Sequence, residues 1–414
     1  MLTVAEALEV ITTRVQPSAP VDRPLLDSLG LTLAQDAVSD IDSPPFDKAL
    51  MDGYAIRAND LTNDRVNSLH VVDEITAGRV GEKSVGPGQA IRIMTGAPIP
   101  DGADAVIQVE LTEFNATTQH VEISSAPVKS GAAILKRAAS MKVGDCVIPQ
   151  GRLLRAQELG ALAELGRHQI RVRSAPRIGV LATGDELVPI DQIPADGQIR
   201  NSNEMMLAAQ IRNAGAIPVP LGIARDERTH LAERIAAGLQ CDMLILSGGV
   251  SAGKLDLVPS QLEEVDVQQI FHKVHVKPGK PIWFGVRSTE DSAGSQATAS
   301  QPVWVFGLPG NPVSSMVCFE LFVRTAIRRL MGIAPAEPQM HKSTLKQGHI
   351  ARGDRPTYHL SRMDITESGF ETTPVPWQGS ADLRATVNAN SLTLFPPGER
   401  QWKPGDIVDV LDWS

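Results

Sequence analysis

The sequence predicts a multi-domain protein of α/β and β units, with a central doubly wound, mostly parallel sheet. Between residues 176 and 331, short apolar runs alternate with helical segments, as in strands covered by helices on both faces. On either side of this region, short β-type runs separated by Gly, Pro and Asp turns predict units built of strands. A chain of 414 residues also exceeds one compact core, so several units are expected.

The N-terminal segment is expected to be helical. Apolar residues recur at the spacing of one helix face over residues 3–16, and Thr3 with Glu6 predicts a capping box. Residues 26–39 are expected to form a second helix or an irregular segment, and residues 155–165 predict one further helix.

These patterns divide the chain into four expected domains. A discontinuous helical linker domain covers 1–43 and 140–175, and an inserted β domain covers 44–139. An α/β domain covers 176–334, and a C-terminal β domain, a small barrel or sandwich, covers 335–414.

The α/β region is the part most clearly defined by its pattern. The last two of its expected strands form a hairpin around a Ser/Ala/Gly/Gln-rich surface loop at 288–301. The expected strands are 178–182, 217–221, 243–246, 268–276, 281–286 and 303–306, and the expected helices begin near 202, 229, 259 and 313.

Composition excludes several classes of function. A net charge of −9 argues against a broad nucleic-acid surface, which needs a basic excess. No apolar run is long enough for a membrane span, and the first residues do not resemble a signal peptide. The three cysteines lack metal-site spacing and are expected to be reduced. We therefore expect a cytoplasmic protein.

Three loops follow expected strands of the central sheet and carry glycine with hydroxyl or amide side chains. They are 183–187 (TGDEL), 247–253 (SGGVSAG) and 307–312 (GLPGNP). Ligands bind at the carboxyl ends of parallel strands, and backbone N–H groups in such loops hold phosphate. Any one of them alone is compatible with an ordinary β–α turn. Their glycine pattern is that of neither a dinucleotide fingerprint nor a Walker loop.

Charged residues lie close to these loops in the sequence. Lys277 and Lys280 stand on a turn stiffened by prolines, which suits a small dianion, although surface lysines are commonly just solvated. Carboxylates near the loops could hold a hard cation such as Mg²⁺ between protein and phosphate, or form a solvated face. These carboxylates are Asp185, Glu186, Asp226 and Asp256.

Seven strings, in this order and spacing, together resemble the molybdopterin molybdenumtransferase family (MoeA in bacteria, the C-terminal domain of gephyrin in animals). They span essentially the whole chain. The strings are MDGYAIR at 51–57, IRIMTGAPIPDGADAVIQVE at 91–110, VLATGDELV at 180–188, GQIRNSN at 197–203, LSGGVSAGKLD at 246–256, VKPGKP at 276–281 and GLPGNPVSS at 307–315.

The resemblance implies an enzyme of molybdenum cofactor biosynthesis. Such an enzyme transfers molybdenum from molybdate to adenylylated molybdopterin and releases AMP, assisted by Mg²⁺. The resemblance also implies an elongated homodimer in which the helical linker domain dimerises and Asp52 reaches the partner's site. The molybdopterin adenylyltransferase and molybdoenzymes are the further partners it suggests.

The same resemblance assigns roles to individual residues. Catalysis would involve Asp52, Glu186, Asp226, Asp256, Lys277 and Lys280, with Mg²⁺ held by Glu186, Asp226 and Asp256. Molybdate would be bound by Lys277, Lys280, Arg355, Ser380, Pro309 and Pro312. Molybdopterin and AMP would be bound by Thr183, Gly184, Asp185, Ser247, Gly248, Gly249 and Ser251.

Four stretches depart from the family pattern. Ala138-Ala139-Ser140 stands where a Gly-Glu-Asp element is usual, Lys48-Ala49-Leu50 precedes the MDG string, Leu360 replaces an expected arginine with Arg362 nearby, and Lys254 replaces an acidic residue or glycine. These departures keep open a non-catalytic or regulatory paralogue that binds pterin. A further alternative is a molybdopterin adenylyltransferase or nucleotide deamidase built on the same α/β domain.

Overall fold

The computed structural model describes residues 1–61, 67–124, 127–249, 257–288 and 301–413. The chain forms two compact units. Within the described ranges, no helix is both long and apolar enough to cross a membrane. The first unit comprises Met1–Gln35, Gly151–Ala156 and Gln169–Ser414, and the second comprises Asp36–Gln150 and Gln157–His168.

The first unit contains a six-stranded sheet in the order β17-β14-β18-β21-β20-β19. The first four strands are parallel, and the last two are antiparallel, so the predicted mostly parallel sheet and its hairpin are confirmed. The strands are β14 (Arg177–Thr183), β17 (Ile217–Ala224), β18 (Met243–Ser247), β19 (Val267–His272), β20 (Trp283–Arg287) and β21 (Val303–Leu308).

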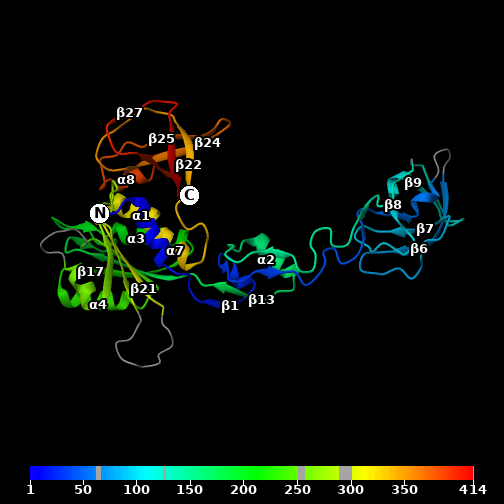
Figure 1. The fold of residues 1–414 in the computed structure, drawn as a ribbon, viewed down its shortest axis with the longest axis horizontal. Helices are drawn as coiled ribbons and strands as arrows, with labels where there is room; N and C mark the ends of the chain where they lie inside the picture. The colour runs from blue at the N-terminus through cyan, green and yellow to red at the C-terminus, as the bar shows by residue number, and fades with distance from the viewer. Residues whose placement is uncertain (62–66, 125–126, 250–256, 289–300, 414) are drawn as a thin grey trace, which may run out of the picture. The chain divides into compact units, whose positions relative to one another are not determined.

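Helices cover both faces of this sheet, as expected for a doubly wound fold. Neighbouring residues of β14 point into different cores, with Val180 facing α1, α3 and α6 and Leu181 facing α4 and α5. Helix α1 packs on α7 through Ala7 and Ile11 (Figure 1). The helices are α1 (Val4–Arg14), α3 (Ser202–Asn213), α4 (Arg228–Gly238), α5 (Val258–Glu264), α6 (Pro312–Cys318) and α7 (Arg324–Leu330).

One helix prediction needs correction, and another is confirmed in detail. The capping box is present, because Thr3 Oγ1 accepts from the Glu6 N–H at 3.2 Å and Glu6 Oε2 accepts from the Thr3 N–H at 2.7 Å. Of the two forms expected for 26–39, the structure shows the irregular segment: a 3-10 turn at Leu26–Ser28 ends before Gly30, whose φ of 77° favours glycine. The helix starting at 313 is interrupted by a π-helical turn at Phe319–Val323.

The C-terminal part of the first unit is a closed barrel in the order β22-β25-β24-β26-β28, one of the two forms expected. Its strands are β22 (Met340–Leu345), β24 (Thr357–Thr366), β25 (Gly369–Pro374), β26 (Ser391–Phe395) and β28 (Ile407–Asp412). Smaller elements of this unit are β1 (Pro20–Pro24), β2 (Thr32–Leu33), β13 (Gln169–Arg173), β15 (Leu187–Val188), β16 (Ile199–Arg200), β23 (His349–Ala351), β27 (Arg400–Trp402) and α8 (Leu383–Thr386).

The second unit contains a six-stranded sheet in the order β8-β5-β7-β6-β10-β9. Apolar side chains pack on both faces, since Tyr54 and Ala55, adjacent on β5, lie in different clusters. The strands are β5 (Gly53–Ile56), β6 (Asn67–Ile75), β7 (Gln89–Ile93), β8 (Ala105–Gln108), β9 (Thr112–Asn115) and β10 (His120–Ile123), beside the pairs β3 (Ala37–Val38) with β12 (Cys146–Ile148) and β4 (Lys48–Ala49) with β11 (Ile134–Leu135), and the helix α2 (Ala156–Glu164).

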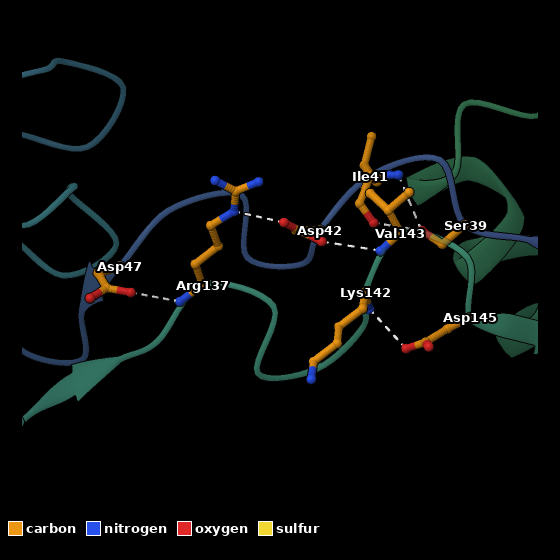
Figure 2. A network of polar contacts seen from close by, with 8 residues as sticks. All are labelled: Ser39, Ile41, Asp42, Asp47, Arg137, Lys142, Val143 and Asp145. Carbon is orange, nitrogen blue, oxygen red and sulfur yellow. Dashed lines mark hydrogen bonds and ion pairs between the residues drawn. The ribbon is translucent and has the colours of Figure 1, made fainter.

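Two chain segments of the second unit, residues 39–47 and 136–145, are joined by charged side chains (Figure 2). Arg137 Nε donates to Asp42 Oδ2 at 2.6 Å, and the Arg137 N–H donates to Asp47 Oδ1 at 2.7 Å. The pKa of Asp42 is lowered first by the hydrogen bond from the Val143 N–H and then by Arg137, and the pKa of Asp47 is lowered first by Lys136 and then by the Arg137 N–H. The segment includes the departure at 138–140, where Ala138 has a φ of 61°, a conformation that favours glycine.

Candidate functional site

The three loops singled out in the sequence follow neighbouring strands. Ala182 of β14 is paired with Ser247 of β18, and Ser247 is paired with Leu308 of β21. Gly248 has a φ of 96°, and a Cβ placed there would lie 2.7 Å from the Thr183 carbonyl oxygen. The first two loops therefore touch through a position that only glycine fits, and the predicted convergence is confirmed.

A cavity of about 750 Å³ opens at these strand ends. Its wall combines hydroxyl, amide and carboxylate groups with apolar side chains, which suits a ligand that has both a charged part and a ring system. The lining residues include Thr183, Gly184, Glu186, Leu187, Ile199, Arg200, Asn203, Asp226, Ser247, Gly248, Gly249, Pro281, Pro309, Gly310, Asn311, Pro312, Ala381 and Leu383.

Asn203 holds two of the loops together, although it was not among the residues predicted for the site. Its Nδ2 donates to Ser247 Oγ and to the Gly310 carbonyl oxygen, each at 2.8 Å. The residue lies in the first turn of α3, whose N-cap is Asn201. The available signal was the GQIRNSN string, which ends at this residue.

Thr183 presents a buried polar atom to the cavity wall. Its residue is 5% exposed, and its Oγ1 has no hydrogen-bond partner among the described residues. A buried hydroxyl without a partner costs roughly 1–3 kcal/mol of folding free energy. A threonine at this position therefore does not stabilise the free chain, and its hydroxyl is a candidate group for binding a ligand.

Three carboxylates lie together at one side of the cavity. Asp185 Oδ1 accepts from the Asp226 N–H at 3.1 Å, and the Glu186 carboxylate folds back over Gly184. Desolvation raises the pKa of Asp226, and the charges of Asp185 and Glu186 raise it further. Mutual repulsion of this kind is relieved when a cation binds.

These carboxylates suit a Mg²⁺ ion that takes its remaining ligands from a bound phosphate and from water. No group of three or more His, Cys, Asp or Glu in the described part of the chain is arranged to enclose a metal ion. Mg²⁺ commonly takes only one or two carboxylates, with water and substrate phosphate completing its shell. Two expected residues, Asp256 and Ser251, lie outside the described residues, as does the departure at Lys254.

The turn that carries Lys277 and Lys280 is fixed on two sides. The Lys277 N–H donates to the Pro356 carbonyl oxygen at 2.9 Å, and its carbonyl oxygen accepts from the Tyr358 N–H at 2.8 Å. Gly279 has a φ of 106°, and a Cβ there would lie 2.4 Å from Cys318 Sγ on α6. Both lysines are exposed. The backbone thus holds two exposed lysines on a rigid support.

The C-terminal barrel supplies the other expected anion-binding residues. Arg355 Nη1 donates to the Val276 carbonyl oxygen at 3.0 Å, and Ser380 Oγ accepts from Asn311 Nδ2 at 2.9 Å. Asn311 occupies the N-cap position of α6, but its side chain binds Ser380 instead of capping the helix. The Val313 N–H donates to the Ser380 carbonyl oxygen. Polar groups at the end of the third loop are therefore already hydrogen-bonded to Ser380 of the C-terminal part.

Four of the residues expected to bind an anion lie outside the lining of the cavity. Neither Lys277, Lys280, Arg355 nor Ser380 belongs to the lining, although Pro281 and Ala381, which follow Lys280 and Ser380, do. Leu360, at the position of the expected arginine, is fully buried in the core. Arg362 is exposed and forms an ion pair with Asp364 at 3.2 Å, so its side chain is engaged elsewhere and does not replace the arginine expected at position 360.

Asp52 lies in the second unit, on the connection between β4 and β5. Its Oδ1 accepts from both the N–H and the Oγ1 of Thr95, each at 2.7 Å. The backbone hydrogen bond and then the hydroxyl lower the pKa of this carboxyl, so it is ionised at neutral pH.

Three family models match the chain in succession. Residues 2–166 match the MoeA N-terminal region (domain I and II), residues 179–329 match a probable molybdopterin binding domain, and residues 342–413 match the MoeA C-terminal region (domain IV). Matches on both sides of the α/β domain fit the layout that the seven strings indicated.

Curated relatives and solved structures agree with these models. A protein named molybdopterin molybdenumtransferase from Staphylococcus epidermidis is 32% identical over 99% of this chain and 95% of its own length. One of the same name from Staphylococcus aureus is 31% identical over 99% and 94%. A molybdopterin biosynthesis MoeA protein from Pyrococcus horikoshii has a TM-score of 0.81 at 28% identity, with 100% of this chain and 99% of that chain covered.

Proposed function

Because this chain belongs to the molybdopterin molybdenumtransferase (MoeA) family, we propose that it inserts molybdenum into molybdopterin. The reaction takes molybdate and adenylylated molybdopterin as substrates and yields molybdenum cofactor and AMP. The observation that carries this proposal is the meeting of the Thr183, Ser247 and Pro309 loops beside the rigid turn of Lys277 and Lys280. Phosphate-holding loops next to paired cations are what a reaction between an oxyanion and a nucleotide ester requires.

Each part of the site has a proposed role. Thr183, Gly184, Asp185, Ser247, Gly248, Gly249 and Ser251 bind the pterin and nucleotide phosphates, and Asn203 keeps two of these loops in register. Molybdate is held by Lys277, Lys280, Arg355 and Ser380, with Pro309 and Pro312 shaping the wall. Positioning and neutralisation of charge account for most of the catalysis.

Glu186 and Asp226, with Asp256, are proposed to hold Mg²⁺. The raised pKa of Asp226 supports this, because a cation between these carboxylates removes the repulsion that disfavours their ionised forms. Bound there, Mg²⁺ would neutralise charge on the phosphates during cleavage of the phosphoanhydride. Protons compete with the cation for Asp226, so Mg²⁺ affinity should fall as the pH falls through the raised pKa of this residue.

We further propose that the protein is a cytoplasmic homodimer. Asp52 is ionised and exposed in the second unit, which supports a role for its carboxylate in completing the site of a partner subunit. The four-domain division, with 1–43 and 140–175 as the dimerisation domain, belongs to the same proposal. Interactions with the molybdopterin adenylyltransferase and with molybdoenzymes also remain predictions.

The test is release of AMP by the purified protein from adenylylated molybdopterin, with Mg²⁺ and molybdate. The account predicts that AMP release depends on molybdate and that Lys277→Ala lowers the rate by about 100-fold or more, because a fixed cation beside the oxyanion is lost. Loss of binding should appear as a raised molybdate concentration at half-maximal rate.

The matched control is Lys403→Ala, which removes another lysine of the same unit away from the cavity lining. Its rate should equal that of the unmodified protein. An unmodified protein that releases no AMP, while a Staphylococcus relative does so in the same assay, would favour a pterin-binding paralogue without this activity. Equal rates for Lys277→Ala and Lys403→Ala would reject the role of Lys277.

A further inference from the structure

Two histidines lie side by side on neighbouring strands of the sheet in the second unit. His70 of β6 and His120 of β10 are directly paired in an antiparallel ladder, and their ring centroids are 5.1 Å apart. Leu69 and Val121, their neighbours along the strands, are buried in the core. Because side chains alternate along a strand, both imidazoles stand on the opposite face of the sheet.

The hydrogen bonds of both rings fix their tautomers. His70 Nδ1 lies 3.1 Å from the Gln119 carbonyl oxygen, and His120 Nδ1 lies 2.7 Å from the Thr118 carbonyl oxygen. A carbonyl oxygen can only accept, so each Nδ1 carries the proton. In the neutral imidazoles, each Nε2 therefore has its lone pair available. Backbone carbonyls orient metal-binding histidines in this way in established sites.

From this geometry we propose that His70 and His120 form a binding site for a borderline divalent transition-metal ion, of which Cu²⁺ is the strongest binder. A ring separation of 5.1 Å permits one ion at about 2.0–2.1 Å from a nitrogen of each ring. Imidazole suits ions of this class, and affinity for a given nitrogen site is highest for Cu²⁺. Solvent would complete the coordination shell, since His70 is exposed.

Neighbouring charges favour a cation at this place. Glu122, two residues along β10 from His120, is paired with Ser68 of β6 and with Glu113 of β9. Carboxylates directly opposite each other repel, and a nearby positive ion reduces that repulsion. All these groups belong to the second unit, and none of them lines the cavity. The site is therefore independent of the proposed molybdenum chemistry.

Cu²⁺ titration of the full-length protein tests the site, with electron paramagnetic resonance as the readout. The unmodified protein should bind one Cu²⁺ with hyperfine structure from two equatorial imidazole nitrogens. His70→Gln and His120→Gln should each weaken binding by roughly tenfold or more and leave at most one of those nitrogens. His70→Asn and His120→Asn replace these variants if either fails to fold.

His168→Gln is the matched control, because His168 is an exposed histidine of the same unit that is not paired with another imidazole. It should leave both the affinity and the spectrum unchanged. Binding by His70→Gln within twofold of the unmodified protein would overturn the proposal. An equal loss of affinity in His168→Gln, or a spectrum without imidazole nitrogens, would overturn it as well.

Discussion

At the scale of single residues, the site contains groups that do not serve stability. Thr183 is the clearest case, because its buried Oγ1 lacks a hydrogen-bond partner in the described structure. Asp226 is another, since burial and then the charges of Asp185 and Glu186 raise the pKa of its carboxyl. Both features are explained if a ligand supplies the missing partner or cation.

Thr183→Val should separate binding from stability. Replacing the unpartnered hydroxyl with a methyl group of similar shape is expected to raise the free energy of unfolding by about 1 kcal/mol. The same change should weaken binding of the adenylylated substrate, because a donor to its phosphate is lost. Chemical denaturation and the KM for this substrate are the two measurements.

Thr325→Val is the control for this comparison. Thr325 is also buried, but its Oγ1 donates to the Leu321 carbonyl oxygen at 2.8 Å. Its replacement should leave KM unchanged and should not stabilise the protein. A Thr183→Val protein that is no more stable than the unmodified one and has an unchanged KM would reject a ligand-binding role for this hydroxyl.

At the scale of elements, the turn at residues 276–281 and barrel strand β24 act together. The turn lies between α6, through Gly279, and the barrel, through Lys277. Its position therefore depends on tertiary contacts on both sides.

Gly279→Ala should displace this turn. The added Cβ would lie 2.4 Å from Cys318 Sγ, at a φ of 106° that alanine rarely adopts. A loss of stability of about 2 kcal/mol or more and a loss of molybdate-dependent AMP release are expected. Gly369→Ala is the control: its φ is 114°, but no atom lies within 4 Å of the added Cβ. The control should lose some stability and keep activity; inactivation of both variants alike would contradict the account.

The barrel should lose stability in acid because of His359. Burial, followed by the proximity of His349, lowers the pKa of His359 from 6.5 to about 4. The unfolded chain takes up a proton below pH 6.5 and the folded chain does so only near pH 4, so stability falls as the pH decreases through this window. The loss is at most about 3 kcal/mol.

Urea unfolding between pH 7 and pH 4 measures this effect. His359→Gln should flatten the pH dependence over the window, because the variant cannot bind the proton. His341→Gln, which replaces a histidine of the same barrel, should keep the dependence of the unmodified protein. Equal slopes for the two variants would show that another group is responsible.

At the scale of the whole molecule, local patterns predicted the elements and the meeting of the three loops. Runs such as Ile178–Ala182 indicate buried parallel strands, and the carboxyl ends of such strands share one edge of the sheet. The sequence did not predict that Asn203 joins two of these loops, because this depends on how α3 packs. Nor did it predict that Asn311 would bind Ser380 instead of capping α6, since the partner lies in the barrel, far along the chain.

The structure also shows how two of the departures from the family pattern are accommodated. Leu360 is buried where an arginine was expected, so the barrel contributes Arg355 but no second cation at that position. Ala138 adopts a glycine-like φ in the segment that Arg137 holds in place through its ion pair with Asp42 and its backbone hydrogen bond to Asp47. These changes are compatible with the fold, and measured activity decides whether they alter catalysis.

The most direct test of the central claim is X-ray absorption at the molybdenum edge. The protein would be incubated with adenylylated molybdopterin, Mg²⁺ and molybdate, and then freed of small molecules. The account predicts that protein-bound molybdenum gains sulfur neighbours from the dithiolene, and that Lys277→Ala does not yield this signal. Molybdenum surrounded by oxygen alone in the unmodified protein, with its fold intact and its substrates present, would contradict the account.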